Sequence, residues 1–158
     1  MEHARSRIAG LVDTSPVVRS PQLSRHLGCD VWLKLENLQP PGSFKVRGAA
    51  SKLLALSARQ RARGVIASSA GNHGAAVAYV ARHIGIPATI CVPETVDPVK
   101  LRAIREYGAE AIVHGARPLM TLSRFPETSK ERMDSAMCTR STIRRSSRGV
   151  TGQVSCPN

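Results

Sequence analysis

Short apolar runs alternate with amphipathic segments through the middle of the chain. The runs have the length of strands, and the amphipathic segments repeat their apolar residues at helical spacing. The predicted strands cover residues 64–68, 87–93 and 111–113, and the predicted helices cover residues 45–61, 75–85 and 99–107. Strands that alternate with helices through short loops are typical of βαβ units. We therefore predict a three-layer α/β fold in which a parallel, twisted sheet has flanking helices.

The N-terminal part of the chain carries a weaker pattern and predicts smaller elements. A helix is expected over residues 2–12, an extended piece over 17–20, a helix over 22–27 and a strand over 31–36. Gly28 is placed to close the second of these helices, because glycine readily adopts the left-handed conformation that ends many helices. The strand leads to Pro41 and Gly42, which break it.

The turn after Gly42 ends in a lysine where the next helix should begin. Ser43 is predicted to cap this helix, so Lys45 falls in its first turn. The start of a helix carries about half a positive charge, which disfavours an ammonium group and favours the neutral, nucleophilic amine. For a lone lysine, an ordinary surface side chain is the simpler interpretation.

A second loop, residues 68–74, joins an apolar run to the following helix. Its sequence, SSAGNHG, brings small residues and backbone N–H groups to a helix start, which suits an anion. The alternative is a plain connection capped by a serine, in which His73 packs or caps rather than acts as a base. Both this loop and the Lys45 turn follow strands, and the carboxyl ends of parallel strands meet at one edge of a sheet. We therefore expect the two loops to converge.

Composition indicates one domain with a large positive net charge. The 158 residues are enough for one domain with a core, and 3% aromatic content leaves that core to aliphatic side chains. The net charge of +12 raises a nucleic-acid-binding module as an alternative from another class. The sequence has no zinc-finger spacing, no basic helix with heptads and no aromatic platform for bases, so we expect no nucleic acid as partner.

The cysteines and the N-terminal sequence predict a cytoplasmic protein. Cys29, Cys91, Cys138 and Cys156 are far apart, form no metal-binding pair and are expected to be reduced thiols. The sequence contains no apolar leader and no stretch of membrane-spanning length, so we expect no membrane partner and no bound metal.

The two loops together resemble a known family. Residues 31–49, VWLKLENLQPPGSFKVRGA, resemble the pyridoxal phosphate attachment segment of the threonine and serine dehydratases, and residues 69–74 resemble their loop for the substrate carboxylate. The resemblance keeps the family's order and spacing from about Arg7 to Ala116. It implies the smaller domain of a fold type II enzyme of the tryptophan synthase beta-like superfamily. It also implies pyridoxal 5'-phosphate as cofactor, an amino acid as substrate and homo-oligomers among full-length relatives.

The resemblance implies a role for each residue of the two loops. Lys45 would attach the cofactor and move the Cα proton, and Phe44 would pack beside the cofactor ring. Asn72 would hydrogen-bond the ring hydroxyl. The substrate carboxylate would be held by Ser69, Ala70, Gly71, Asn72 and His73. An amino acid fixed by its carboxylate in this way presents its Cα–H bond to the lysine.

Ala70 distinguishes the dehydratases from the related serine racemases. In the racemases this position is a serine that exchanges protons on the opposite face of the cofactor ring, and alanine has no such proton. The resemblance therefore implies an ammonia-lyase that converts L-threonine or L-serine to a 2-oxo acid and ammonia. Serine racemase is the alternative, followed by another fold type II enzyme such as a threonine synthase or a β-replacement enzyme.

The resemblance stops after Arg117, and residues 117–158 form a basic tail without clear periodicity that is expected to be irregular. Read one base out of register, residues 141–157 permit FDDPAVIAGGHGTGVLPE, which resembles the next segment of the dehydratase family. We therefore predict a frameshifted tail and, over residues 1–116, a partial and inactive enzyme. Apolar surface should be exposed on the sheet, and the chain should retain the cofactor weakly or not at all.

Overall fold

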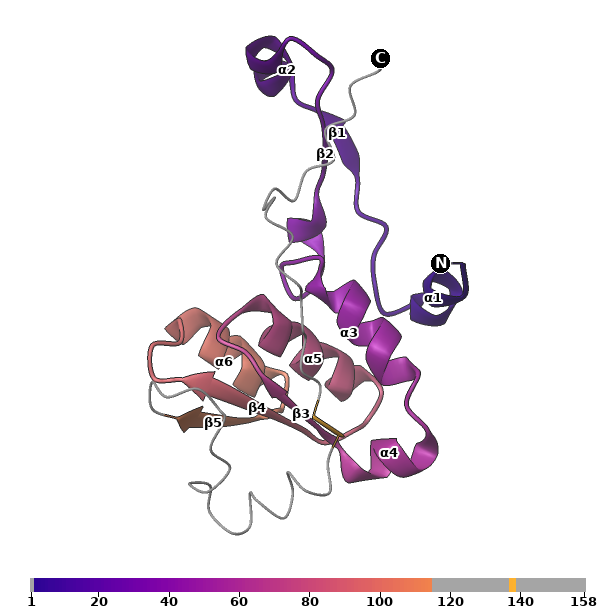
Figure 1. Ribbon diagram of the computed structural model, residues 1–158, viewed down its shortest axis with the longest axis vertical. Coiled ribbons are helices and arrows are strands. Elements are labelled where there is room, and N and C mark those ends of the chain that lie inside the picture. Colours follow the sequence, from indigo (N-terminus) through magenta and orange to yellow (C-terminus); the bar gives the residue numbers. More distant parts are fainter. Residues whose placement is uncertain (1, 115–136, 139–158) are drawn as a thin grey trace.

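An arm projects from an α/β body in the computed structural model, which describes residues 2–114 and 137–138 (Figure 1). The arm contains β1 (Val17–Arg19), α2 (Pro21–Leu27), β2 (Trp32–Lys34) and the 3-10 helix η1 (Glu36–Leu38). The helices of the body are α1 (Glu2–Ile8), α3 (Lys45–Leu54), α4 (Ala58–Arg63), α5 (Asn72–His83) and α6 (Pro98–Glu106). Its strands are β3 (Val65–Ser68), β4 (Ala88–Pro93), β5 (Glu110–His114) and β6 (Met137–Cys138).

Within the described residues, four parallel strands form the sheet of the body in the order β5-β4-β3-β6. Val65 of β3 is aligned with Ala88 of β4, and Thr89 of β4 with Glu110 of β5. α5 packs against β3 and β4, α6 packs against β5, and α3 packs on α5. The predicted α/β class, with a parallel sheet and flanking helices, is confirmed.

Small side chains let α5 approach the sheet closely. Its buried positions hold glycine, alanine and valine: Gly74, Ala75, Ala76, Val77, Ala78, Val80 and Ala81. A Cβ on Gly74 would lie only 2.9 Å from Cγ2 of Ile90, a fully buried side chain of β4. The start of α5 therefore reaches this position against β4 because residue 74 has no side chain.

The single helix predicted over residues 45–61 is wrong, because the chain forms α3 and α4 there. Ser57 begins α4 with a capping box: Ser57 Oγ accepts from the Gln60 N–H, and Gln60 Oε1 accepts from the Ser57 N–H. A helix that continued through Ser57 would lose both hydrogen bonds. The helix predicted over residues 2–12 also ends earlier, at Ile8.

The arm is a short antiparallel strand pair with α2 between its strands. α2 ends at Gly28, which has a φ of +67°, as predicted. Most of the large apolar side chains that the described residues expose lie in the arm or beside it: Val17, Val18, Leu23, Leu27, Trp32, Leu38 and Phe44. β3 is buried at Val65, Ile66 and Ala67, whereas Val113 of β5 is 46% exposed, and the expected exposure of the sheet where a second domain would pack stays a prediction.

The predicted tail, residues 117–158, lies outside the described residues except for Met137 and Cys138. These two form β6 and pair with Val65 and Ile66 of β3. Among the helices of the described ranges, none has the length and apolar character that a membrane span requires.

Candidate active site

The turn that leads into α3 is shaped by proline and glycine. The N–H of Gly42 donates to the carbonyl of Gln39 at 2.6 Å across Pro40 and Pro41, and Gly42 has a φ of +72°, which favours glycine. Tyr107, at the end of α6, donates its hydroxyl to the Pro40 carbonyl at 3.3 Å. The turn is therefore tied to the body just before α3 begins.

Lys45 is the first residue of α3, as predicted, but Ser43 is not its cap. Phe44 directly precedes the helix with φ −59° and ψ −13°, and no side chain among the described residues accepts a hydrogen bond from the first N–H groups of α3. Ser43 is only 6% exposed, and its Oγ has no hydrogen-bond partner among the described residues. The ammonium nitrogen of Lys45 lies 4.8 Å from the centroid of the Phe44 ring, close enough for a cation–π contact.

The second loop connects β3 to α5 and is held by a hydrogen bond to β4 and by one within the loop. The N–H of Ser69 donates to the Cys91 carbonyl at 3.0 Å, and the N–H of Gly71 donates to Ser69 Oγ at 3.2 Å. α5 begins at Asn72, so Asn72 and His73 stand in its first turn. The first N–H groups of a helix have no intrahelical acceptor and are available to an anion.

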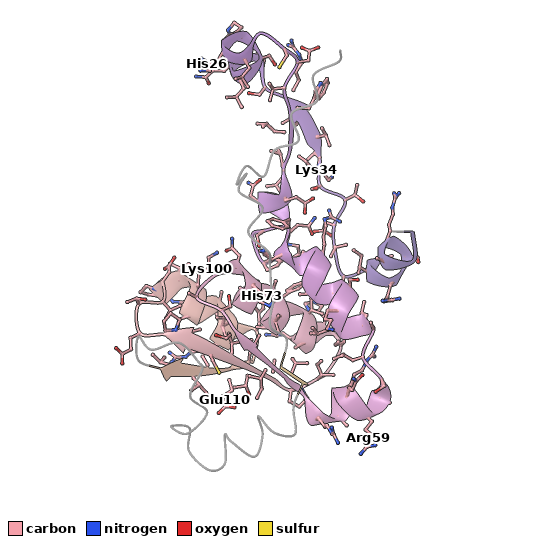
Figure 2. All side chains as sticks on the ribbon, in the orientation of Figure 1. His26, Lys34, Arg59, His73, Lys100 and Glu110 are labelled. Atoms are coloured by element: carbon pink, nitrogen blue, oxygen red, sulfur yellow. The ribbon has the colours of Figure 1, made fainter. Side chains whose placement is uncertain are left out.

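The start of α3 acts electrostatically on the start of α5. α3 packs on α5, and His73 stands in the first turn of α5 (Figure 2). Burial lowers the pKa of His73 below its usual value of 6.5, and the positive charge of Lys45 lowers this pKa further. The imidazole is therefore neutral at neutral pH. Its Nε2 atom has no hydrogen-bond partner among the described residues.

Within the described residues, Ser43 Oγ and His73 Nε2 are thus buried polar atoms without partners. Leaving such an atom unsatisfied costs about 1–3 kcal/mol, so its presence in a fold calls for a reason. Ala70 and Asn72 are exposed beside them, whereas Ser69 and Gly71 are half-buried. Ser43 Oγ, two residues before Lys45, and His73 Nε2, in the first turn of α5, are therefore the atoms that a polar ligand held between the two loops would satisfy.

Sequence reasoning missed an ion pair that spans the Lys45 turn. Arg47 Nε donates to Glu36 Oε2 at 2.8 Å, and Arg47 Nη2 donates to Glu36 Oε1 at 2.8 Å. These hydrogen bonds lower the pKa of Glu36 and raise the pKa of Arg47. The available signal was a charged residue on each side of the turn, but only the folded chain shows that the two side chains meet.

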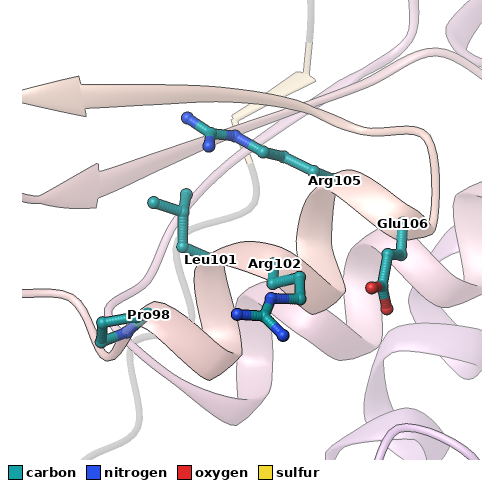
Figure 3. Close-up of a pocket in the computed structure, with 5 residues that line it drawn as sticks. All are labelled: Pro98, Leu101, Arg102, Arg105 and Glu106. Carbon is teal, nitrogen blue, oxygen red and sulfur yellow. The ribbon is translucent and has the colours of Figure 1, made fainter.

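A shallow hollow of about 480 Å³ lies elsewhere, on α6 (Figure 3). It is lined by Pro98, Leu101, Arg102, Arg105 and Glu106. None of the predicted site residues lines it, so we locate the candidate site from the chemistry of the two loops rather than from this hollow.

Comparison with known proteins defines the class of this protein. A family model described as pyridoxal-phosphate dependent enzyme matches residues 8–154. The chain belongs to this family, whose cofactor is pyridoxal phosphate. The predicted fold type and cofactor are thereby confirmed.

Two curated relatives show which enzymes of this family the chain is similar to. The biosynthetic L-threonine dehydratase of Haemophilus influenzae is 39% identical over 127 residues, which cover 80% of this chain and 25% of that protein. The catabolic L-threonine dehydratase of Staphylococcus aureus is 42% identical over 132 residues, which cover 83% of this chain and 38% of that protein. The chain therefore spans well under half the length of these curated relatives. The resemblance to the dehydratases is confirmed.

A solved structure also has a similar fold. Maize serine racemase superimposes with a TM-score of 0.77 and 32% identity, and the match covers 87% of this chain and 41% of that one. Racemases and dehydratases thus share this arrangement of helices and strands, so the backbone alone does not separate the two activities.

Proposed function

We propose that this chain is part of an ammonia-lyase that converts L-threonine or L-serine to a 2-oxo acid and ammonia. The observation that carries the proposal is the packing of α3, which begins at Lys45, on α5, whose first turn holds His73, so that the charge of Lys45 acts on His73. Two relatives that are 39% and 42% identical bear the name threonine dehydratase, which supports this reaction.

The residues around Lys45 fit pyridoxal phosphate. The lysine is half-buried, and two buried polar atoms have no partner among the described residues: Ser43 Oγ, two positions before Lys45, and His73 Nε2, in the first turn of α5. We assign Lys45 as the attachment residue, Phe44 to the side of the cofactor ring and Asn72 to the ring hydroxyl. When bound, the cofactor withdraws electrons from the Cα of the amino acid and so weakens its Cα–H bond.

The protein's own groups then bind the substrate and move its proton. Backbone N–H groups at the start of α5 attract the substrate carboxylate, because this end of the helix dipole favours an anion. The loop that we assign to this carboxylate consists of Ser69, Ala70, Gly71, Asn72 and His73. A neutral His73 contributes a hydrogen bond and no charge. With the carboxylate fixed, the amine of Lys45 would take the Cα proton, and the β-hydroxyl would take up a proton and leave as water. The enamine that remains would then react with water to give the 2-oxo acid and ammonia.

Serine racemase is the second candidate, because maize serine racemase has a similar fold. Ala70 argues against it, since the exposed methyl group of this residue has no proton to exchange on the opposite face of the substrate. Replacing the corresponding alanine by serine in an intact homologue should introduce racemisation. No gain of racemisation would count against this use of Ala70.

We also infer that residues 117–158 are translated out of register. The family match reaches residue 154, beyond the predicted boundary at Ala116, so the boundary stays a prediction. A single-base register change is expected near the codons for Arg117 and Pro118. Sequencing of the coding DNA decides this point, and an unbroken frame there contradicts the inference. We further expect reduced cysteines, a cytoplasmic location and homo-oligomers among full-length relatives.

The activity can be tested once the reading frame of residues 117–158 is restored. The frame-restored chain, supplied with pyridoxal phosphate, should release a 2-oxo acid and ammonia from L-threonine or L-serine. Lys45→Ala is the control and should abolish this release, because the proton acceptor is lost. Cofactor binding without release of 2-oxo acid from either substrate would overturn the proposal, and formation of D-serine in its place would favour the racemase.

A further inference from the structure

We propose that Glu36 and Arg47 act as a pair of positioning residues that orient Lys45 for attachment of the cofactor. This inference rests on the proposed function of Lys45. The stretch that carries Phe44 and Lys45 runs from Glu36, in η1, to Arg47, in the first turn of α3. An ion pair between the two ends of this stretch therefore restricts the position of Lys45 without contacting it.

The contact between the two side chains is rigid. Both bonds of the arginine fork are 2.8 Å long, and each reaches a different oxygen of the carboxylate. The Glu36 side chain is 19% exposed and the Arg47 side chain 33% exposed, so solvent competes only in part. Ser15 adds its hydroxyl to Glu36 Oε1 at 2.5 Å. A planar, two-bonded pair of this kind fixes direction as well as distance.

A third segment locks the pair to the rest of the chain. Arg47 Nη2 also donates to the Asp13 carbonyl at 3.1 Å. The buried side chain of Gln39 donates to the same carbonyl at 2.7 Å and accepts from the Asp13 N–H at 3.1 Å. The ends of the Lys45 stretch and the segment around Asp13 therefore form one hydrogen-bonded unit.

This unit supplies the restraint that the start of α3 otherwise lacks. No side chain among the described residues caps α3, and an uncapped first turn tends to fray. Val46 is fully buried on one side of that turn, and Arg47 is held by Glu36 on the next. Rotation of the turn would therefore expose Val46 or break the hydrogen bonds of Arg47. Lys45 is left on the helix face of Ala49, which is buried where α3 packs on α5.

The test measures how selectively pyridoxal phosphate reacts with Lys45 in the 158-residue chain. The chain is incubated with the cofactor, borohydride reduces the new carbon–nitrogen bond to a stable amine, and peptide mapping quantifies the label on each lysine. Lys52 and Lys100 serve as internal references. The variants are Glu36→Gln, Arg47→Lys and the double variant. Arg19→Lys is the matched control, because Arg19 forms an ion pair with Asp30 in the arm, with two of its guanidinium nitrogens donating to Asp30 Oδ1.

We expect the wild-type chain to be labelled preferentially at Lys45. Each single variant should lower the ratio of Lys45 label to reference label about tenfold, as when a reacting group loses the hydrogen bonds that orient it. The double variant should lose no more than either single one, because the residues act as a unit. Arg19→Lys should leave the ratio unchanged. The far-UV circular dichroism of all variants should match the wild type.

The possible failures are distinguishable. Equal labelling of all lysines in the wild-type chain would overturn the proposed role of Lys45 itself. Selective labelling that persists in both single variants would leave that role standing and overturn the positioning inference. Loss of helical signal in both single variants would also overturn it, because the pair would then stabilise the fold rather than direct Lys45.

Discussion

Gly74→Ala tests whether the close contact between α5 and β4 sets the position of the second loop. The added Cβ would lie 2.9 Å from Cγ2 of Ile90, 3.4 Å from Cδ1 of Ile104 and 3.4 Å from Cβ of Ser69. Both isoleucines are 0% exposed, and a β-branched side chain has little freedom to move aside. The first turn of α5, which carries His73, must therefore move away from β4.

The expected cost follows from two opposing effects. Overpacking of a tight core destabilises by about 1–3 kcal/mol. Alanine favours a helix over glycine by about 0.8–1 kcal/mol, which offsets part of that cost. Gly48 in α3 provides the matched control, because no described atom lies within 4 Å of the position of its Cβ. Gly48→Ala gains the helix preference without the clash, so the two variants should differ by about 1–3 kcal/mol in unfolding free energy.

Urea unfolding of both variants, followed by far-UV circular dichroism, measures this difference. Gly74→Ala should unfold at a lower urea concentration than Gly48→Ala, with similar slopes. The reasoning is refuted if the two variants unfold together or if Gly74→Ala is the more stable. Either result would show that α5 adjusts to a side chain at residue 74 without loss of packing.

Other measurements address the site and the chain. Because the pKa of His73 is lowered in the fold, the unfolded chain binds a proton at this residue first as pH drops below about 6.5, and the unfolding free energy should fall there. Urea unfolding at a series of pH values should show this decline, and His73→Gln should flatten it. A second decline should begin near pH 4.5, because the pKa of Glu36 is also lowered, and it should weaken in Glu36→Gln. Ser57→Ala removes the capping box of α4 and should cost about 1 kcal/mol in the same titration, whereas no loss would mean that the box contributes nothing. The 158-residue chain, mixed with pyridoxal phosphate and desalted, should show no cofactor absorbance band and no turnover; a stable yellow protein would contradict this.

Prediction from the sequence succeeded where the deciding information is local. The alternation of apolar runs with helical patterns predicted the parallel sheet and its helices, because the spacing of apolar residues within each element shows which face it buries. Gly28 was predicted to end α2, and Lys45 was predicted to lie in the first turn of α3. The roles of the site residues were implied only by resemblance and stay predictions.

Prediction failed where two local signals competed or where distant residues meet. Serine is a residue type that often caps helices, yet Ser43 Oγ makes no hydrogen bond to the start of α3. The apolar pattern over residues 45–61 concealed the capping signal at Ser57. Spacing along the chain could not reveal the pairing of Glu36 with Arg47 either, because the turn between them can adopt many shapes.

The sequence by itself determined the class of fold, the place of Lys45 at a helix start and the small residues of the loop before α5. These features depend on local backbone preference and on periodic burial, which nearby residues specify. Only the tertiary structure decided that the half-buried His73 is influenced by the charge of Lys45, and that Glu36, Arg47 and Asp13 form one hydrogen-bonded unit. Electrostatic coupling and hydrogen bonding act over a few ångströms in space, and the packing of α3 on α5 sets those distances.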